Sequence, residues 1–261
     1  MKKIFRLERL FISQYLKQLI EYKGDFLVGL FGFLLEQGLN ILMIAIIFTK
    51  IPDLKGWSLQ QVIFIYGFSL IPKGLDHLFF DNLWAVGQRL VRKGDFDKYM
   101  TRPINPLVYV LIETFQVDAI GEIFVGILLL ASSWGSIHWG LLKILLFIIV
   151  IPFSTAIYTS LKIALSSLAF WMKQSGSLLY VFYQINDFAK YPVTIYNNGV
   201  KFLISFIIPF AFTAYYPAKY FLTNESPLFN IGTVILISIM LLCGSLWIWN
   251  KGISAYESSG S

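Results

Sequence analysis

Long apolar stretches alternate with short polar segments along the chain. Three of these stretches, at 123–142, 144–161 and 226–250, contain no Asp, Glu, Lys or Arg. A helix rises about 1.5 Å per residue, so each stretch is long enough to cross the hydrocarbon core of a bilayer about once. A soluble domain has no need for three such segments. The pattern therefore predicts an all-α, polytopic membrane protein.

We predict about six membrane-spanning helices, the fifth of which is ambiguous. They cover 26–48, 60–80, 107–130, 140–171, 176–191 and 228–249. In this interpretation 176–191 is a short crossing. The following 197–222 forms helical pieces that enter the outer leaflet and return, with breaks at Pro209 and Pro217. The alternative makes 202–220 the fifth span and leaves 174–198 in the membrane interface.

The N-terminal segment has a different pattern from the spans. Apolar residues recur every three or four positions between 3 and 22, and basic and polar residues fill the positions between them. This spacing is typical of an amphipathic helix with a basic face, which lies in the plane of the membrane surface. We therefore predict an interfacial helix within 1–25. Packing of this helix against a partner on the soluble side is an alternative that does not exclude the first.

Charged residues orient the predicted spans. Only 14% of residues are charged, against about 25% in an ordinary soluble domain. Thirteen Lys and Arg residues lie on the side that holds both termini and the 81–106 loop, and five lie on the other side. Loops rich in Lys and Arg stay in the cytoplasm. The net charge of +6 therefore reflects topology and anionic lipid headgroups rather than nucleic acid as a partner. One membrane domain, 1–261, accounts for the chain.

Signatures of catalysis and of metal binding are missing from the sequence. Gly135 and Gly140 have the glycine spacing of a phosphate-binding loop, but leucines follow where Lys and Ser or Thr are needed. The two histidines, His77 and His138, belong to no metal-binding motif. We therefore expect no catalytic residue, no metal site and no cofactor bound by this chain. A membrane-embedded enzyme acting on lipids is the least favoured hypothesis.

Ionisable residues inside the predicted spans are candidates for function, because a charge at the bilayer centre is costly. The acidic ones are Glu36, Asp76, Glu113, Asp118 and Glu122. Glu36 is the deepest, and we expect it to face the protein interior or to pair. The group could line a substrate path or relay protons, or it could form interhelical pairs such as Lys73 with Glu113. Lys143 and Lys162 are interpreted as structural residues whose long side chains carry the charged group to either membrane–water interface.

The 81–106 segment predicts a short cytoplasmic helix. Residues 84–91 can continue the preceding helix, Gly94 breaks it, and 95–100 can form an amphipathic turn that ends before Pro103. An aromatic knob flanked by charges, formed here by Phe96 and Tyr99, suits docking into the groove of a partner. A solvated basic loop is the alternative.

Four segments together resemble a known family. Residues 92–106, RKGDFDKYMTRPINP, resemble the signature R-x-G-x-[FL]-[DE]-x-x-L-x-R-P-x-N-P of the permease subunits of type-2 ATP-binding-cassette (ABC) exporters. The segments KYPVTIY at 190–196, IPFAF at 208–212 and YYPA at 215–218 are similar to the family's pattern ahead of its last span. Met100, where the signature prefers leucine, and Asn197-Asn198, where a proline is common, depart from the pattern.

The resemblance implies a function and a set of partners. Two permease chains, identical or related, form the pathway in a bacterial plasma membrane, surrounded by lipid. A separate cytoplasmic ABC ATPase dimer binds ATP and Mg and drives transport. The residues implied in ATPase coupling are Arg92, Gly94, Asp95, Phe96, Asp97, Tyr99, Arg102 and Pro103. The outer re-entrant region is implied at 193–225, with Tyr191, Pro192, Pro209 and Pro217.

Neither the residues nor the resemblance selects a substrate. A drug, a peptide and a lipid-linked molecule all suit an aromatic-rich cavity. The main alternative function is an ion-coupled secondary transporter or channel that uses Glu36, Asp118 and Glu122. Such a protein would need no ATPase, and its transport would stop when a protonophore collapsed the ion gradient.

Overall fold

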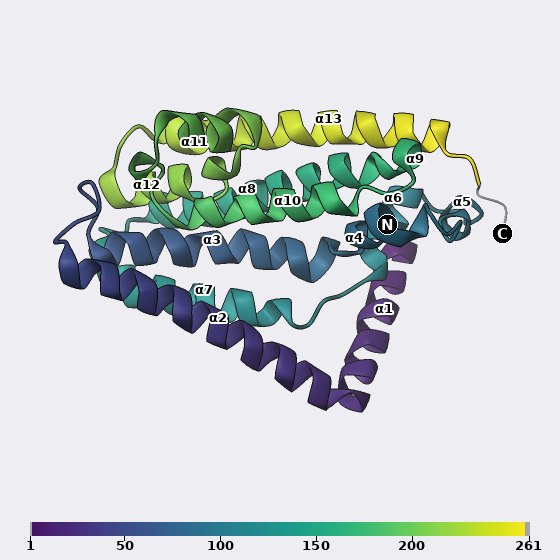
Figure 1. The fold of residues 1–261 in the computed structure, drawn as a ribbon, viewed down its shortest axis with the longest axis horizontal. Helices are drawn as coiled ribbons and strands as arrows, with labels where there is room; N and C mark the ends of the chain where they lie inside the picture. The colour runs from purple at the N-terminus through teal and green to yellow at the C-terminus, as the bar shows by residue number, and fades with distance from the viewer. Residues whose placement is uncertain (1, 259–261) are drawn as a thin grey trace.

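The computed structural model describes residues 2–258, apart from the side chains of residues 2, 3, 18 and 25. Within this range the chain is helical, with an isolated bridge between Leu54 and Trp57 and no extended strand. The longest helices lie side by side along the long axis of the molecule (Figure 1). They are α2 (Lys23–Lys50), α3 (Leu59–Phe80), α7 (Ala119–Ser133), α8 (Leu141–Ser167) and α13 (Thr233–Ala255). The prediction of an all-α membrane protein is confirmed.

Five helical segments in the described part are long and apolar enough to span a membrane, and a bent pair would make six if it were one span. The starts and ends of these helices place the connecting segments at two opposite ends of the bundle. Both termini and the segment around residue 90 lie at one end, on the right in Figure 1, and the connection between α2 and α3 lies at the other. The structure thus agrees with the predicted grouping of termini and 81–106 loop.

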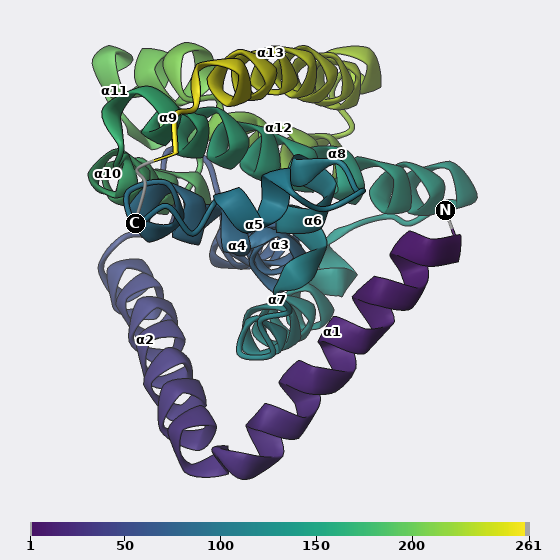
Figure 2. The ribbon, with the colours of Figure 1, turned by 90° about the vertical axis from the view of Figure 1, so that its right-hand side faces the viewer.

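Helix α1 (Lys2–Glu21) runs across this end instead of along the bundle. Figures 1 and 2 show that it meets α2 at a sharp corner, so that the two helices form a V around one flank of α7. Phe11 attaches α1 to the body by packing edge-on against Tyr109, with ring centroids 5.8 Å apart. The predicted N-terminal helix is present, and its direction across the other helices suits a location along a membrane surface.

The predicted continuous span at 107–130 is wrong. The chain forms α6 (Pro106–Glu113), leaves the helical conformation, and starts again as α7 at Ala119. Thr114 is extended (φ −117°, ψ 138°), and the N–H of Gln116 donates to the carbonyl oxygen of Leu78 at 3.0 Å. Phe115 also packs on Phe79. Contacts with α3 therefore replace the helical hydrogen bonds that the break removes.

The region between α8 and α13 consists of short helices. Their bounds are α9 (Ala169–Met172), α10 (Gly176–Asn186), η3 (Asp187–Lys190), η4 (Val193–Ile195), α11 (Asn198–Phe202), η5 (Leu203–Ile207), η6 (Phe210–Phe212), α12 (Tyr215–Thr223) and η7 (Leu228–Gly232). The pair 198–207 and 210–223 is bent by 76°. Both halves lie at the left end in Figure 1, whereas α10 runs along the bundle beside α8. This arrangement favours a re-entrant 198–223 over a straight fifth span, and the crossing by α10 stays a prediction.

Two glycines let α3 and α7 approach closely in the middle of the bundle. A Cβ atom on Gly67 would lie 2.8 Å from the Cβ of Leu129, and one on Gly126 would lie 3.0 Å from the carbonyl oxygen of Gly67. Small residues at helix contacts are a common source of packing in membranes, where apolar surface alone gives no preference for a neighbouring helix over lipid. The α3–α7 pair therefore forms the rigid centre on which the polar residues described next are placed.

Candidate functional site: an ion network in the bundle and a platform at its end

A fully buried lysine joins α8 to the C-terminal end of α3. The Nζ of Lys162 on α8 lies 2.7 Å from Asp76 Oδ2 and 3.1 Å from Asp81 Oδ1. Asp76 also accepts hydrogen bonds from Thr159 (2.7 Å) and Tyr183 (3.0 Å). Both oxygens of Asp76 are therefore occupied by the protein itself. The expectation that Lys162 reaches an interface is wrong, because two carboxylates pair with it in the interior.

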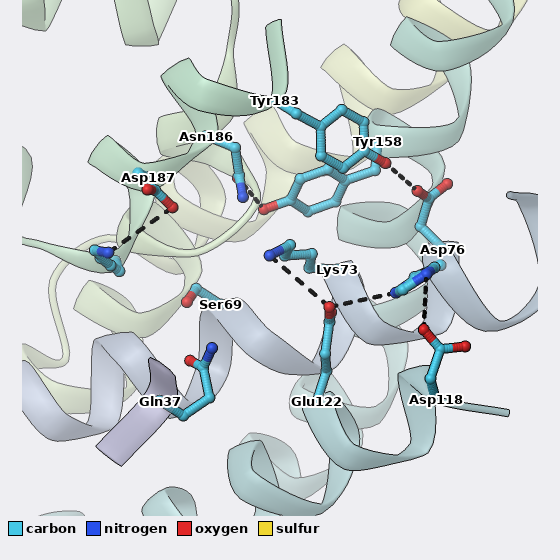
Figure 3. Close-up of polar contacts among 12 residues, drawn as sticks. Gln37, Ser69, Lys73, Asp76, Asp118, Glu122, Tyr158, Tyr183, Asn186 and Asp187 are labelled. Atoms are coloured by element: carbon cyan, nitrogen blue, oxygen red, sulfur yellow. Dashed lines mark hydrogen bonds and ion pairs between the residues drawn. The ribbon is translucent and has the colours of Figure 1, made fainter. Parts of the chain in front are cut away.

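Next to this lysine, His77 connects two acidic residues (Figure 3). Its Nδ1 lies 3.3 Å from Glu122 Oε1, and its Nε2 lies 3.6 Å from Asp118 Oδ2. Lys73 completes the group at 3.9 Å from Glu122. His77 thus brings Asp118 and Glu122 together, although Asp118 precedes α7 rather than lying inside a continuous helix. The proposed pairing of Lys73 with Glu113 is wrong.

The two groups line a common polar cavity. Its volume is about 460 Å³, and it is lined by Lys73, His77, Asp81, Trp84, Gln88, Glu122 and Tyr183. Oε2 of Glu122 is buried and has no hydrogen-bond partner among the described residues. A buried polar atom without a partner is costly, so this oxygen is available to a ligand that donates a hydrogen bond. Pairing and cavity lining, predicted as alternatives, thus occur together.

Glu36 lies outside this site. Its side chain is exposed on α2, and no hydrogen bond or ion pair reaches it within the described part of the chain. The neighbouring Gln37 is buried instead and accepts a hydrogen bond from Tyr66 on α3. The expectation that Glu36 faces the interior of this chain is therefore wrong by one helical position, a rotation of about 100° about the helix axis.

Glu113 also lies elsewhere, at the end of the bundle that holds both termini. It ends α6 and accepts hydrogen bonds from Lys98 (2.9 Å), Asn82 (3.1 Å) and the Tyr99 hydroxyl. Three donors fix its carboxylate in this position. Glu113 therefore holds the 92–103 segment and does not line the polar cavity, contrary to the prediction.

Residues 92–103, which we call the platform, fold onto this end of the bundle. The chain turns at Gly94, whose φ of +77° favours glycine, and forms α5 (Asp97–Met100). Phe96 and Tyr99 have no exposed surface. Phe96 packs against Phe170 (4.9 Å between centroids) and Trp249 (6.0 Å). The predicted exposed aromatic knob is wrong, because Phe96 packs against α9 and α13 and Tyr99 packs against Tyr109 of α6.

The outer surface of the platform is basic with one apolar residue. Its exposed side chains are Arg92, Lys93, Asp95, Lys98, Met100, Thr101, Arg102 and Pro103. Met100 is 44% exposed, and the cationic side chains surround it in sequence. An apolar residue among charges is a common arrangement at protein interfaces. Met100, rather than Phe96 or Tyr99, is thus the exposed apolar side chain among the charges of this segment.

The segment after α13 holds the platform from the side. Tyr256 donates to Asp97 Oδ1 at 2.8 Å, and Ser258 donates to Oδ2 at 2.6 Å. The hydrogen bond from Ser258 stabilises the carboxylate most, and the bond from Tyr256 adds to it. Together they lower the pKa of Asp97. Asp97, predicted as a coupling residue, is thus engaged by its own chain. Tyr256 and Trp249 were not predicted as contacts of the platform, although their position as aromatic residues near the end of a span was a signal that could have identified them.

The predicted residues of the outer region gather at the opposite end. Pro192, Pro209 and Pro217 are buried, and Tyr191 is half-buried. The region is tied to the α2–α3 connection, since Trp57 Nε1 donates to Thr194 at 3.0 Å. This end is therefore a packed cap on the bundle.

Comparison with known proteins gives one match. The model of a family described as "ABC-2 family transporter protein" matches residues 34–260. The chain belongs to the ABC-2 transporter family. ABC-2 permeases are membrane components of transport systems and are not themselves catalytic. The resemblance found in the sequence is confirmed, and the matched range contains both the polar cavity and the platform. No curated protein and no solved structure matches this ABC-2 chain significantly.

Proposed function

We propose that this ABC-2 permease is the membrane subunit of an ATP-driven exporter in a bacterial plasma membrane, with both termini in the cytoplasm. Two copies, or this chain and a related one, form the substrate pathway. A separate dimer of ABC ATPases binds ATP and Mg and performs the hydrolysis. The permease contributes the pathway and the surface through which ATPase movement reaches the spans.

The platform is the observation that carries this proposal. It contains residues 92–103 of the 92–106 family signature, it lies at the end where both termini meet, and it is anchored in the bundle by Phe96 and Tyr99. Phe96 contacts Phe170 beyond α8 and Trp249 in α13. A force applied to the exposed Met100 and Arg102 is therefore transmitted through packed aromatic rings to two long helices.

The polar cavity supports the pathway. Residues of α3, α7 and α10 line it, and the surface of α2 is largely exposed. Lys73 and Glu122 on its wall can bind polar groups, and Trp84 and Tyr183 can contact apolar ones. In the proposed dimer the second permease covers the exposed face of α2 and closes the cavity into a channel.

Purification of the chain from its native membrane in mild detergent, followed by mass spectrometry, tests the proposal. We expect a soluble ABC ATPase in stoichiometric amount. The double variant Met100→Asp, Arg102→Glu puts negative charges in place of an apolar and a cationic side chain on the platform surface. It leaves the buried Phe96 and Tyr99 unchanged, so it should fold but lose the ATPase. The control Lys55→Glu changes an exposed charge at the opposite end and should retain it.

The opposite outcome favours the ion-coupled transporter. In that case the chain is recovered alone, even after cross-linking at the platform, and the double variant has no effect. Transport by membrane vesicles would then continue without ATP and stop on addition of a protonophore. Such ion coupling would reside in the group that Lys73, His77 and Asp118 form around the buried Glu122.

A further inference from the structure

We propose that this chain has a binding site for the phosphate group of an anionic membrane lipid, in a cavity between η1 (Val86–Leu90) and the start of α10. This cavity, which we call the cationic mouth, has a volume of about 620 Å³. Arg89, Arg92 and Lys93 line it from one side, and Ser177 and Tyr180 line it from the other. No Asp or Glu lies on its wall.

The cations of the mouth are not neutralised by the protein. Among the described residues, no ion pair involves Arg89, Arg92 or Lys93, and Arg92 donates only to the neutral Gln174, at 2.9 Å. Inside the bundle the situation is the reverse, since Lys73 and Lys162 each pair with a carboxylate. Three cations around one cavity repel each other, and a bound anion with several oxygens relieves this repulsion.

Backbone N–H groups at the start of α10 also favour an anionic ligand. Helix α10 begins at Gly176, and its preceding residue Ser175 makes no side-chain capping hydrogen bond. Gly176 and Ser177 both line the mouth, so the first N–H groups of an 11-residue helix are available there. Helix N-termini attract anions through these N–H groups and the helix dipole. The side-chain charges and the helix end therefore favour a phosphate at one place.

The surroundings indicate a lipid rather than free phosphate. Tyr180 and Val181 line the mouth and are 60% and 57% exposed, and Leu178 beside them is also exposed. Trp171 and Met172, just before α10, expose further apolar surface. An apolar helix face that starts at a cationic cavity matches the two parts of an anionic phospholipid, whose headgroup meets the cations while an acyl chain follows the helix.

Lipid binding to the purified full-length chain tests the site without reference to transport or ATPase. Native mass spectrometry counts bound lipid, and a thermal melt gives its effect on stability. The probes are phosphatidylglycerol, phosphatidylcholine and inorganic phosphate. The variant Arg89→Gln, Lys93→Gln removes two cations and leaves Arg92 in place. The control Lys55→Gln, Lys201→Gln removes two exposed or half-exposed cations at the opposite end.

We expect phosphatidylglycerol to bind the wild type and the control and to raise their melting temperatures, and to bind the mouth variant about tenfold or more weakly. Phosphatidylcholine should bind all three equally weakly, because its headgroup has no net charge. Equal binding of phosphatidylglycerol to the mouth variant overturns the site. Equal protection by the same concentration of inorganic phosphate overturns the lipid assignment.

Discussion

Helices α2 and α3 are both apolar spans in the sequence, but they hold opposite positions in the fold. In α2, 11% of the spanning residues are buried, and in α3 the share is 72%. Within its span the more buried helix carries a lysine, an aspartate, a histidine and a proline, whereas α2 carries one charged residue, Glu36, between Phe26 and Phe48. In a bilayer, lipid already satisfies apolar side chains, so polar residues and close contacts decide which helix lies inside. Burial here follows polarity, which is the reverse of the rule for soluble proteins.

The difference also assigns roles to the two helices. Helix α3 carries the buried Asp76 and the contact glycine Gly67, so changes in it act on the stability of the single chain. Helix α2 makes few contacts within the chain, and among its described side chains the one buried polar residue is Gln37. Its exposed surface faces lipid or the proposed second permease, and changes in it act on assembly.

The largest expected effect comes from Asp76. Asp76→Leu leaves the buried Lys162 with Asp81 alone and removes the acceptor of Thr159 and Tyr183, so we expect a loss of about 3–5 kcal/mol of stability. Glu36→Leu, its counterpart on α2, should change the stability of the single chain by less than about 0.5 kcal/mol. Thermal melts of both variants in the same detergent make the comparison. Similar destabilisation by the two would break the contrast between the helices.

A smaller effect is expected from the glycines. Gly67→Val places a side chain against Leu129 and the backbone of α7, which should cost about 1–3 kcal/mol through overpacking. A Cβ on Gly29 of α2 meets no atom within 4 Å, so Gly29→Val should be tolerated by the folded chain. Melting temperatures in detergent measure both. A Gly67→Val variant as stable as Gly29→Val would show that α3 and α7 do not pack closely.

The smallest effect concerns the hydrogen bond that joins the two helices. Tyr66 of α3 donates to Gln37 of α2. Gln37→Leu and Tyr66→Phe each remove one side of this bond, and a double-mutant cycle should give a coupling energy of about 0.5–1.5 kcal/mol. Additive effects of the two substitutions would mean that α2 is held to α3 by other contacts.

The spans were predictable from sequence because each is a long segment with few charges. The bounds of α2, α3, α8 and α13 differ from the predicted ones by a few residues. The break after Glu113 was not predictable, since Thr-Phe-Gln-Val at 114–117 contains neither glycine nor proline. The cause is a hydrogen bond from Gln116 to Leu78, a contact that depends on how two spans pack.

The site was predicted less well, because residues that contact each other there lie far apart in the sequence. The acidic residues around His77 were found, because a charge within an apolar run is visible locally. The role of Lys162 was missed, because its partner Asp81 lies 81 residues earlier. Phe96 was identified as important, but placed on the wrong side of the platform. A short amphipathic helix does not reveal which face is covered, and here α13 covers the aromatic one.

The contact between Phe96 and Trp249 has a consequence for the order of assembly. The platform is synthesised before most of the chain, but Phe96 lacks two of its ring partners, Trp249 and Tyr256, until residues 249–256 have left the ribosome and α13 has been inserted. A nascent or stalled chain therefore does not present the finished platform surface. If the proposed ATPase binds that surface, its recruitment selects completed chains.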